Sequence, residues 1–194
     1  MISIESHQEP ATIDLPVKRL IFAAATLAVA MPGGLGSPAA QSLGAGLYAY
    51  ISDNDASCNS LFLIGKKAIL VVDTGLNDME GEKLLAAIRS ISPLPVRYIV
   101  NTHYHPDHQA ANGIVGPASE VASTLFTRQR TIELMNRRAP SVHFRPAAIT
   151  ITREADIYLD DQQVHVEFAG PAHTMGDLVV YFLCKELWPQ VISF

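Results

Sequence analysis

The sequence predicts an α/β fold in which short buried strands alternate with helices. Three observations predict it. The apolar runs at 58–64 and 68–72 are separated only by residues 65–67, which is typical of a β-hairpin. A helical pattern follows at 80–92, where apolar residues recur every three or four positions. Another apolar run, 96–100, leads directly into a cluster of histidines, and open α/β sheets commonly present a site at the end of a buried strand.

Length and composition indicate one globular domain. The chain has 194 residues, of which 48% are hydrophobic and 17% are charged, and a chain of this length usually forms a single domain. Its formal net charge is -5, whereas nucleic acids and anionic membranes are bound by basic surfaces. We therefore expect a small-molecule substrate, no nucleic-acid partner, and no membrane partner for the mature chain.

The N-terminal segment, residues 1–39, has the pattern of an export signal. Lys18 and Arg19 precede an apolar run at 20–31, which is shorter than the roughly 20 residues that span a bilayer. Small residues at 37–39 fit a cleavage site. The alternative is a buried apolar helix near the N-terminus. We expect cleavage and an exported protein, either periplasmic or secreted.

The chain before the histidine cluster is expected to form three strands and a helix. A strand at 47–52 precedes the hairpin, whose second strand ends at Asp73-Thr74-Gly75. Asn77 or Asp78 is suited to cap the following helix, because either side chain accepts hydrogen bonds from backbone amides. The predicted inward face of that helix comprises Leu84, Leu85, Ile88 and Ile91.

Two helical segments and a strand are expected after the cluster. The pattern predicts a short helical turn at 109–112, a strand at 120–123 and a helix at 124–138. The predicted inward residues of this last helix are Leu125, Ile132 and Met135, and its predicted solvated face carries Arg128, Arg130, Arg137 and Arg138.

After a loop at 139–148, the remaining chain is predicted to form strands, in which apolar and polar residues alternate. Asp160-Asp161 predicts a two-residue turn between two of these strands. His165 falls on the wet face of its strand, while His7 and His143 have no partners at ligand spacing. The predicted strands are 149–151, 156–159, 164–168 and 178–182.

The histidine cluster has the composition of a metal site. His103, His105, Asp107 and His108 fall within six residues, and imidazole nitrogen and carboxylate oxygen suit zinc and its divalent neighbours. Residues two apart in an extended backbone point the same way, so His103 and His105 can reach one ion. Pro106 forces a turn that can bring Asp107 and His108 back beside it. The alternative is a polar loop whose histidines form local hydrogen bonds.

A second stretch offers a distant ligand. His173 lies in a loop bounded by Gly170-Pro171 and Gly176, between two predicted strands. With the cluster it completes a set of three histidines around one ion. The two cysteines, Cys58 and Cys184, are not at zinc-type spacing. We expect free buried thiols, although one disulfide would also be compatible with an exported protein.

These residues resemble the metallo-β-lactamase superfamily of metal-dependent hydrolases. The resemblance rests on the H-x-H-x-D-H motif at 103–108, the loop Gly170-Pro171-Ala172-His173-Thr174, and the earlier Asp73-Thr74-Gly75. It covers about 47–182. It implies a four-layer αβ/βα sandwich, of which the predicted mature domain, 40–194, supplies the N-terminal portion.

The resemblance also implies the roles of the site residues. His103, His105 and His173 would bind a first zinc ion, and Asp107 and His108 a second. A metal-held hydroxide would attack an ester, thioester, lactone or β-lactam bond, with Asp107 as the catalytic residue that orients it. Asp73 would either steady the metal loops through hydrogen bonds or serve only as a turn residue.

The sequence departs from the family pattern after the His173 loop. The family continues with a bridging aspartate and a final histidine, whereas residues 183–194 contain neither. We therefore expect that the reading frame is interrupted near Phe182 and that the second half of the fold is largely missing. We also expect one or two zinc ions per chain, and self-association through the exposed sheet edges. The alternative function is a non-catalytic, metal-binding or inactive fragment of such a hydrolase.

One other resemblance is weaker. Residues 70–75, Leu-Val-Val-Asp-Thr-Gly, are similar to a motif of aspartic proteases, in which two carboxylates share a proton. Leu76 departs from that motif, and an aspartic protease would leave both histidine stretches unexplained.

Overall fold

The computed structural model describes residues 40–137, 142–183 and 190–192, all within one compact unit, Gly36–Phe194. The predicted export signal and Cys184 lie outside the described residues. Within the described ranges, no helix has the length and apolar character needed to cross a membrane.

A seven-stranded sheet, ordered β1 to β7, forms the centre of the unit. Its first four strands pair antiparallel, so the predicted hairpin is confirmed, and β4 to β7 are parallel. The strand β1 was not predicted from the sequence. The strands are β1 (Gln41–Gly44), β2 (Leu47–Tyr50), β3 (Ser60–Ile64), β4 (Ile69–Val72), β5 (Val96–Val100), β6 (Glu120–Thr124) and β7 (Ile149–Ile151).

A smaller antiparallel sheet, ordered β11-β10-β9-β8, packs on the large one. Asp160 and Asp161 form the predicted turn between β8 and β9. The Asp160 carboxylate also accepts hydrogen bonds from the backbone amides of Lys66 (2.6 Å) and Lys67 (3.2 Å), which ties this turn to the β3–β4 turn. The strands are β8 (Glu154–Leu159), β9 (Gln162–Glu167), β10 (Val179–Leu183) and β11 (Gln190–Ile192).

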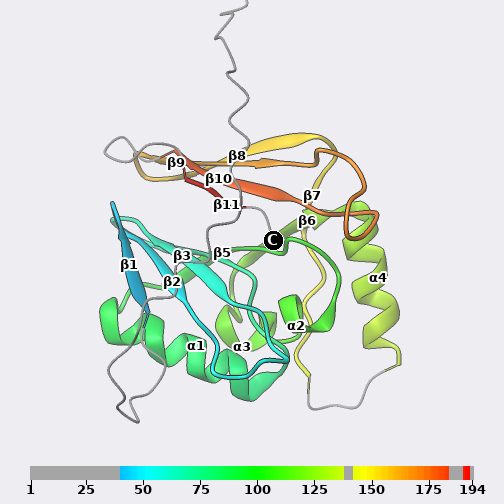
Figure 1. Ribbon diagram of the computed structural model, residues 1–194, viewed down its shortest axis with the longest axis horizontal. Helices are drawn as coiled ribbons and strands as arrows, with labels where there is room; N and C mark the ends of the chain where they lie inside the picture. Colours follow the sequence, from blue (N-terminus) through cyan, green and yellow to red (C-terminus); the bar gives the residue numbers. More distant parts are fainter. Residues whose placement is uncertain (1–39, 138–141, 184–189, 193–194) are drawn as a thin grey trace, which may run out of the picture. The chain divides into compact units, whose positions relative to one another are not determined.

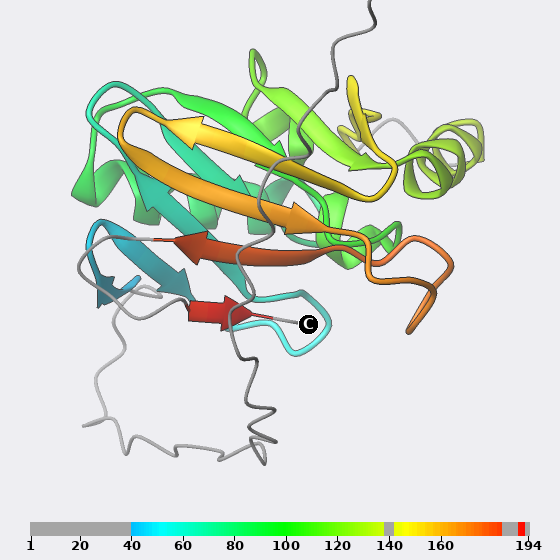
Figure 2. The ribbon, with the colours of Figure 1, turned by 90° about the horizontal axis from the view of Figure 1, so that it is seen from above.

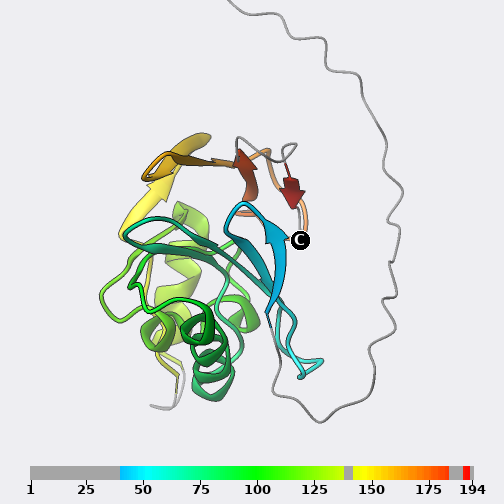
Figure 3. The same ribbon diagram turned by 90° about the vertical axis from the view of Figure 1, so that its left-hand side faces the viewer.

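The layers follow from strands that are apolar on both faces. In β4, Leu70 and Val72 join the core between the two sheets, whereas Ile69 and Val71 join the core beneath the helices. Figures 1 and 3 show helices on one face of the large sheet and the small sheet on the other. Figure 2 shows the small sheet lying over the large one. The helices are α1 (Asp78–Ile91), α2 (Pro106–Gln109), α3 (Asn112–Val115) and α4 (Leu125–Met135).

The predicted α/β class is therefore confirmed. Helices, the large sheet and the small sheet make three layers, and in the described part of the chain no helix covers the outer face of the small sheet (Figure 1). This arrangement agrees with the N-terminal portion of a four-layer αβ/βα sandwich.

Two details of the predicted helices are wrong. Ile91 is exposed, because it is the last residue of α1 and no further helical turn shields it. The predicted turn at 109–112 is instead two short helices, α2 and α3, because Pro106 takes the first position of a helix rather than only ending one. The open choice of cap is settled, since the Asn77 side chain accepts a hydrogen bond from Glu80 N (3.1 Å).

The buried face of α4 is also different from the prediction. Leu125, Ile132 and Met135 were expected to point inward, yet all three are exposed. Thr127 and Thr131 are buried instead, because their hydroxyls have hydrogen-bond partners inside the fold. Apolar periodicity does not reveal such a polar contact, which depends on segments distant in sequence.

Replacing Gly81 by alanine is expected to destabilise the fold by about 1–3 kcal/mol through overpacking. A Cβ atom at this position would lie 2.5 Å from the Ala111 Cβ, so α1 would have to move away from the start of α3. Helix propensity alone predicts the opposite effect, an increase of about 1 kcal/mol in the free energy of unfolding. Urea unfolding would measure the change, with Glu82→Ala on the exposed face of α1 as the control. Equal or greater stability of Gly81→Ala would contradict the tight packing.

Candidate metal centre

The site begins where β5 ends, between two parallel neighbours. The Asp73 amide donates to Val100 O (3.0 Å), and the Asn101 amide donates to Ala122 O (2.9 Å). Thr102 and His103 then leave the sheet at its C-terminal edge while still buried. The sheet thus fixes the start of the histidine loop from both sides.

A buried carboxylate holds this loop. Asp73 is fully buried and has a left-handed backbone, with φ of 58°. One carboxylate oxygen accepts from the Thr102 amide (2.9 Å), and the other accepts from the Thr102 hydroxyl (2.6 Å) and from His108 Nδ1 (2.7 Å). Asp73 is therefore both a turn residue and the hydrogen-bond partner of the histidine loop.

A network of buried amides supports the other end of the loop. Asn112 exchanges side-chain hydrogen bonds with Asn101 (2.8 and 3.1 Å) and accepts one from the Thr74 hydroxyl (2.8 Å). The His108 carbonyl accepts from the Thr74 amide (2.9 Å) and from the Asn101 side chain (3.3 Å). These contacts fix the backbone on which His108 sits.

Three histidine rings converge beside this loop. His105 Nδ1 lies 3.1 Å from His103 Nε2 and 3.1 Å from His173 Nε2. Two nitrogens on a tetrahedral zinc ion, with Zn–N bonds of about 2.0–2.1 Å, are about 3.3–3.4 Å apart. The three rings therefore have the spacing of a three-histidine ligand set. Neutral imidazole is the form that binds metal, and burial together with the nearby His108 lowers the pKa of His103 to about 4.

Two sets of contacts bring His173 to this position from a distant loop. The Asp177 carboxylate accepts from the Thr174 amide (2.6 Å) and hydroxyl (3.0 Å). The Gly176 carbonyl accepts from the hydroxyls of Thr124 (3.1 Å) and Thr127 (3.2 Å) at the start of α4. The contacts of Asp177 therefore support the loop that carries His173.

His108 and Asp107 form a charged pair at the edge of the cluster. His108 Nε2 lies 3.2 Å from an Asp107 oxygen. Burial opposes a charge on His108, but the carboxylates of Asp73 and Asp107 outweigh it and raise the pKa to about 10. Burial likewise opposes the charge on Asp107, but the hydrogen bond from His108 lowers the pKa of that carboxyl.

Asp107 does not join a convergent ligand set in the described residues. Groups with ligand atoms within 4.8 Å of one another are His103, His105 and His173, and separately Cys58, Asp73 and His108. Cys58 is free, and burial raises the pKa of its thiol. The structure thus brings together the three predicted ligands of a first ion. It places the two predicted ligands of a second ion, Asp107 and His108, against each other.

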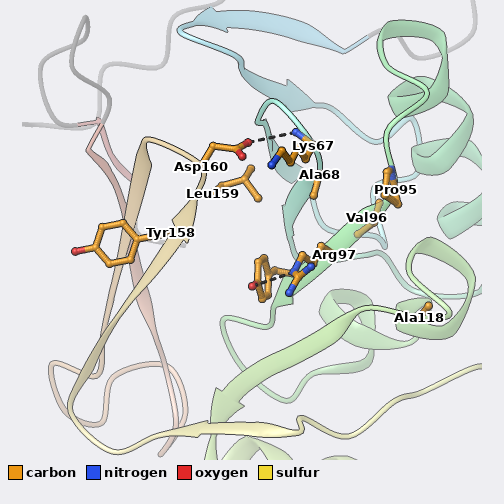
Figure 4. A pocket seen from close by; sticks show the side chains of 10 residues that line it. Lys67, Ala68, Pro95, Val96, Arg97, Ala118, Tyr158, Leu159 and Asp160 are labelled. Carbon is orange, nitrogen blue, oxygen red and sulfur yellow. Dashed lines mark hydrogen bonds between the residues drawn. The ribbon is translucent and has the colours of Figure 1, made fainter.

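Other polar features lie apart from this cluster. His143 pairs with Asp78 (2.9 Å) and His165 with Asp156 (2.8 Å). A cavity of about 410 Å³ lies at the opposite edge of the sheet, where Lys67 precedes β4 and Arg97 lies near the start of β5 (Figure 4). No histidine or cysteine lines this cavity.

No role had been predicted from the sequence for several supporting residues. Thr102, Asn101, Thr74 and Asn112 act through hydrogen bonds across 11 to 38 positions of sequence. For Thr74, Asn101 and Thr102 the available signal was their position, because polar residues just after apolar strands have to find partners when buried.

Comparison with known proteins agrees on the family. The model of the metallo-beta-lactamase superfamily matches residues 53–187. A metallo-beta-lactamase from Pontibacter korlensis is similar in structure, with a TM-score of 0.61 and 21% identity over 74% of this chain and 66% of that one. A motif mutant of the metallo-beta-lactamase from Cronobacter sakazakii gives a TM-score of 0.65 and 15% identity over 80% and 63%.

One curated relative matches a short part of the chain. A linear primary-alkylsulfatase from a Pseudomonas species is 43% identical over 54 residues, which are 28% of this chain and 10% of the relative. The chain thus spans about two thirds or less of the length of the proteins named here.

The metal-free protein should lose stability on both sides of about pH 6.5. His108 has a folded pKa of about 10, above its ordinary 6.5, so its contribution is complete below 6.5 and is lost as the pH rises through 10. His103 has a folded pKa of about 4, so the unfolded chain binds more protons between 6.5 and 4, and stability falls on acidification.

Unfolding in the presence of a chelator across this pH range would measure both effects. Asp73→Asn should flatten the alkaline fall, because it removes a carboxylate that raises the pKa of His108. Asp156→Asn, at the exposed pair with His165, is the control. An unchanged alkaline slope in Asp73→Asn would contradict the assigned ion pair.

Proposed function

Because the chain belongs to the metallo-beta-lactamase superfamily, we propose that it is a zinc-dependent hydrolase whose first metal is bound by His103, His105 and His173. The observation that carries this proposal is the 3.1 Å spacing of His105 Nδ1 from the other two ring nitrogens. The neutral state of His103 and the rigid support of the His173 loop fit the same role.

Asp107 and His108 are the proposed ligands of a second ion. Asp73 accepts a hydrogen bond from His108 Nδ1, which leaves Nε2 as the nitrogen available on the side of Asp107. Metal-binding histidines commonly donate their other N–H to a carboxylate in this way. A cation would replace the proton on Nε2, while Asp73 would keep the ring in place.

The proposed chemistry is hydrolysis of an ester-like bond. When bound, zinc lowers the pKa of water to about 7 and polarises the scissile bond. Asp107 is 34% exposed at its side chain, so it can reach a solvent molecule, orient it and accept its proton. Burial and the hydrogen bonds from Thr102 to Asp73 keep the surrounding loop fixed while this proton moves.

The bond class is proposed from the residues and the relatives. Ester, thioester, lactone and β-lactam bonds all place a polarised carbonyl near the ion. The relative named as a linear primary-alkylsulfatase adds a sulfate ester as a further type of bond. A small-molecule substrate fits all of these bonds.

A metal-binding protein without turnover is the second candidate function. The observation that favours it is that Asp107 belongs to no three-residue ligand group among the described residues. Such a protein would bind zinc at the three histidines without hydrolysing any ester.

Zinc content and hydrolysis of the purified chain would test these functions. We expect about one zinc ion per chain or more, with both zinc and hydrolysis lost on His103→Ala or His173→Ala, because each removes one of three ligands. His165→Ala changes a histidine that pairs with Asp156 outside the cluster, and should leave both unchanged. Zinc without hydrolysis of any ester class would support the second function, and absence of zinc would contradict both.

Residues 1–39 are proposed as an export signal that is cleaved near residue 39. Leu27→Arg should block export, because a charge interrupts the apolar run at 20–31. Cell fractionation and the mass of the exported product would measure this, with Glu5→Gln, which precedes the run, as the control. If the unsubstituted protein stays in the cytoplasm and is not cleaved, the proposed export is contradicted.

A further inference from the structure

An apolar hollow of about 210 Å³ lies beside the histidine cluster. It is formed between the start of α4, the strand β7 and the loop that carries His173. The large side chains that line it are Leu125, Phe126, Ile151, Phe168 and Met175.

Two of these side chains are unusually exposed for their type. Leu125 is 55% exposed and Met175 is 58% exposed, although both are large and apolar. They come from segments 50 positions apart and lie on the rim of the same hollow. Contiguous exposed apolar side chains that line a hollow are typical of a binding site rather than of ordinary surface.

The loop that carries His173 also lines the hollow. Met175 follows His173 by two residues in the same loop, and Gly176 anchors that loop to Thr124 and Thr127. A Cβ at Gly176 would lie only 2.5 Å from the Thr124 hydroxyl oxygen, so the loop lies directly on α4.

Aromatic rings continue this lining to the ligand histidines. Phe126 contacts Tyr104 with ring centroids 5.9 Å apart, and Tyr104 contacts His105 at 4.6 Å. These ring contacts connect the hollow with His105, one of the three ligand histidines.

The chemistry of the lining selects an uncharged occupant. None of the residues that line the hollow is acidic, basic or a histidine, and its polar members are the three threonines Thr124, Thr150 and Thr152. Burying a charge there would be costly without a partner. The occupant that fits is a hydrocarbon chain or ring whose polar end lies outside the hollow.

We infer that this hollow binds the alkyl or aryl group of the substrate, so that the enzyme cleaves esters with an apolar portion. This inference rests on the proposed function, because the histidines would hold the polar, scissile end. Leu125 and Met175 are the residues that determine specificity, and they act by contact with the hydrocarbon. The substrate class is thus an amphipathic ester with a hydrocarbon chain or ring next to the bond.

Binding of linear carboxylates to the zinc-loaded full chain tests the inference. The probes are butanoate, hexanoate and octanoate, measured by titration calorimetry below the concentrations at which they form micelles. Affinity should rise about two- to fourfold for each added methylene group, as expected for burial of hydrocarbon. Leu125→Gln and Met175→Gln should remove most of this dependence on chain length.

The matched control is Ile132→Gln. Ile132 is also apolar and exposed on α4, but it does not line the hollow. This variant should keep the full dependence on chain length. Zinc content measured in every variant shows whether the fold and the histidine cluster are intact.

Three results would overturn the inference. The first is an affinity for carboxylates that does not depend on chain length. The second is an equal loss of this dependence in Ile132→Gln and Leu125→Gln. The third is that the protein binds no carboxylate but forms a dimer, which Leu125→Gln dissociates. Zinc content and hydrolysis are measured separately. A protein that binds zinc and is active, but whose affinity does not depend on the length of the carboxylate, would therefore overturn only the assignment of the hollow. A chain that binds carboxylates by length but lacks hydrolysis would overturn the proposed hydrolysis and leave the hollow as a site that binds hydrocarbon.

Discussion

The contact on which the site depends is the one between the Asp73 carboxylate and the histidine loop. Asp73 is fully buried, so it requires compensating partners, and it finds them in the Thr102 amide, the Thr102 hydroxyl and His108. Because Asp73 directly follows β4 and Thr102 lies just beyond the end of β5, the parallel pairing of these strands places donor and acceptor side by side. The left-handed backbone of Asp73 is held by the same contacts.

The second constraint is the anchoring of a distant loop. His173 comes to His105 because Gly176 lies on the start of α4 and Asp177 folds the loop on itself. The Leu178 amide also donates to the Thr102 carbonyl (2.8 Å), which joins this loop to the end of β5. The histidines of both loops are thus positioned by backbone hydrogen bonds and by small or hydroxyl side chains. The same anchoring creates the apolar hollow, because it exposes Met175 beside Leu125.

Much of the fold follows from local patterns. The strand β4 is a short buried apolar run and β5 ends in one, and their lengths and turn residues were sufficient to predict them. The inward face of α4 was not predictable in this way, because Thr127 and Thr131 are buried by partners at Gly176 and Gln109. The strand β1 was also missed, since its four residues, Gln41–Gly44, are mostly exposed and give no apolar signal.

The sequence by itself determined the residue types of the site, because three histidines and an aspartate within six positions have few other uses, and the superfamily followed from that motif. Only the tertiary structure decided which of these groups converge. It brings His173 to His103 and His105 but leaves Asp107 against His108, and it makes Asp73 and Thr102 partners. The physical reason is that ligand convergence depends on strand pairing and loop anchoring between segments up to 70 residues apart, whereas a sequence pattern reports only on neighbours along the chain.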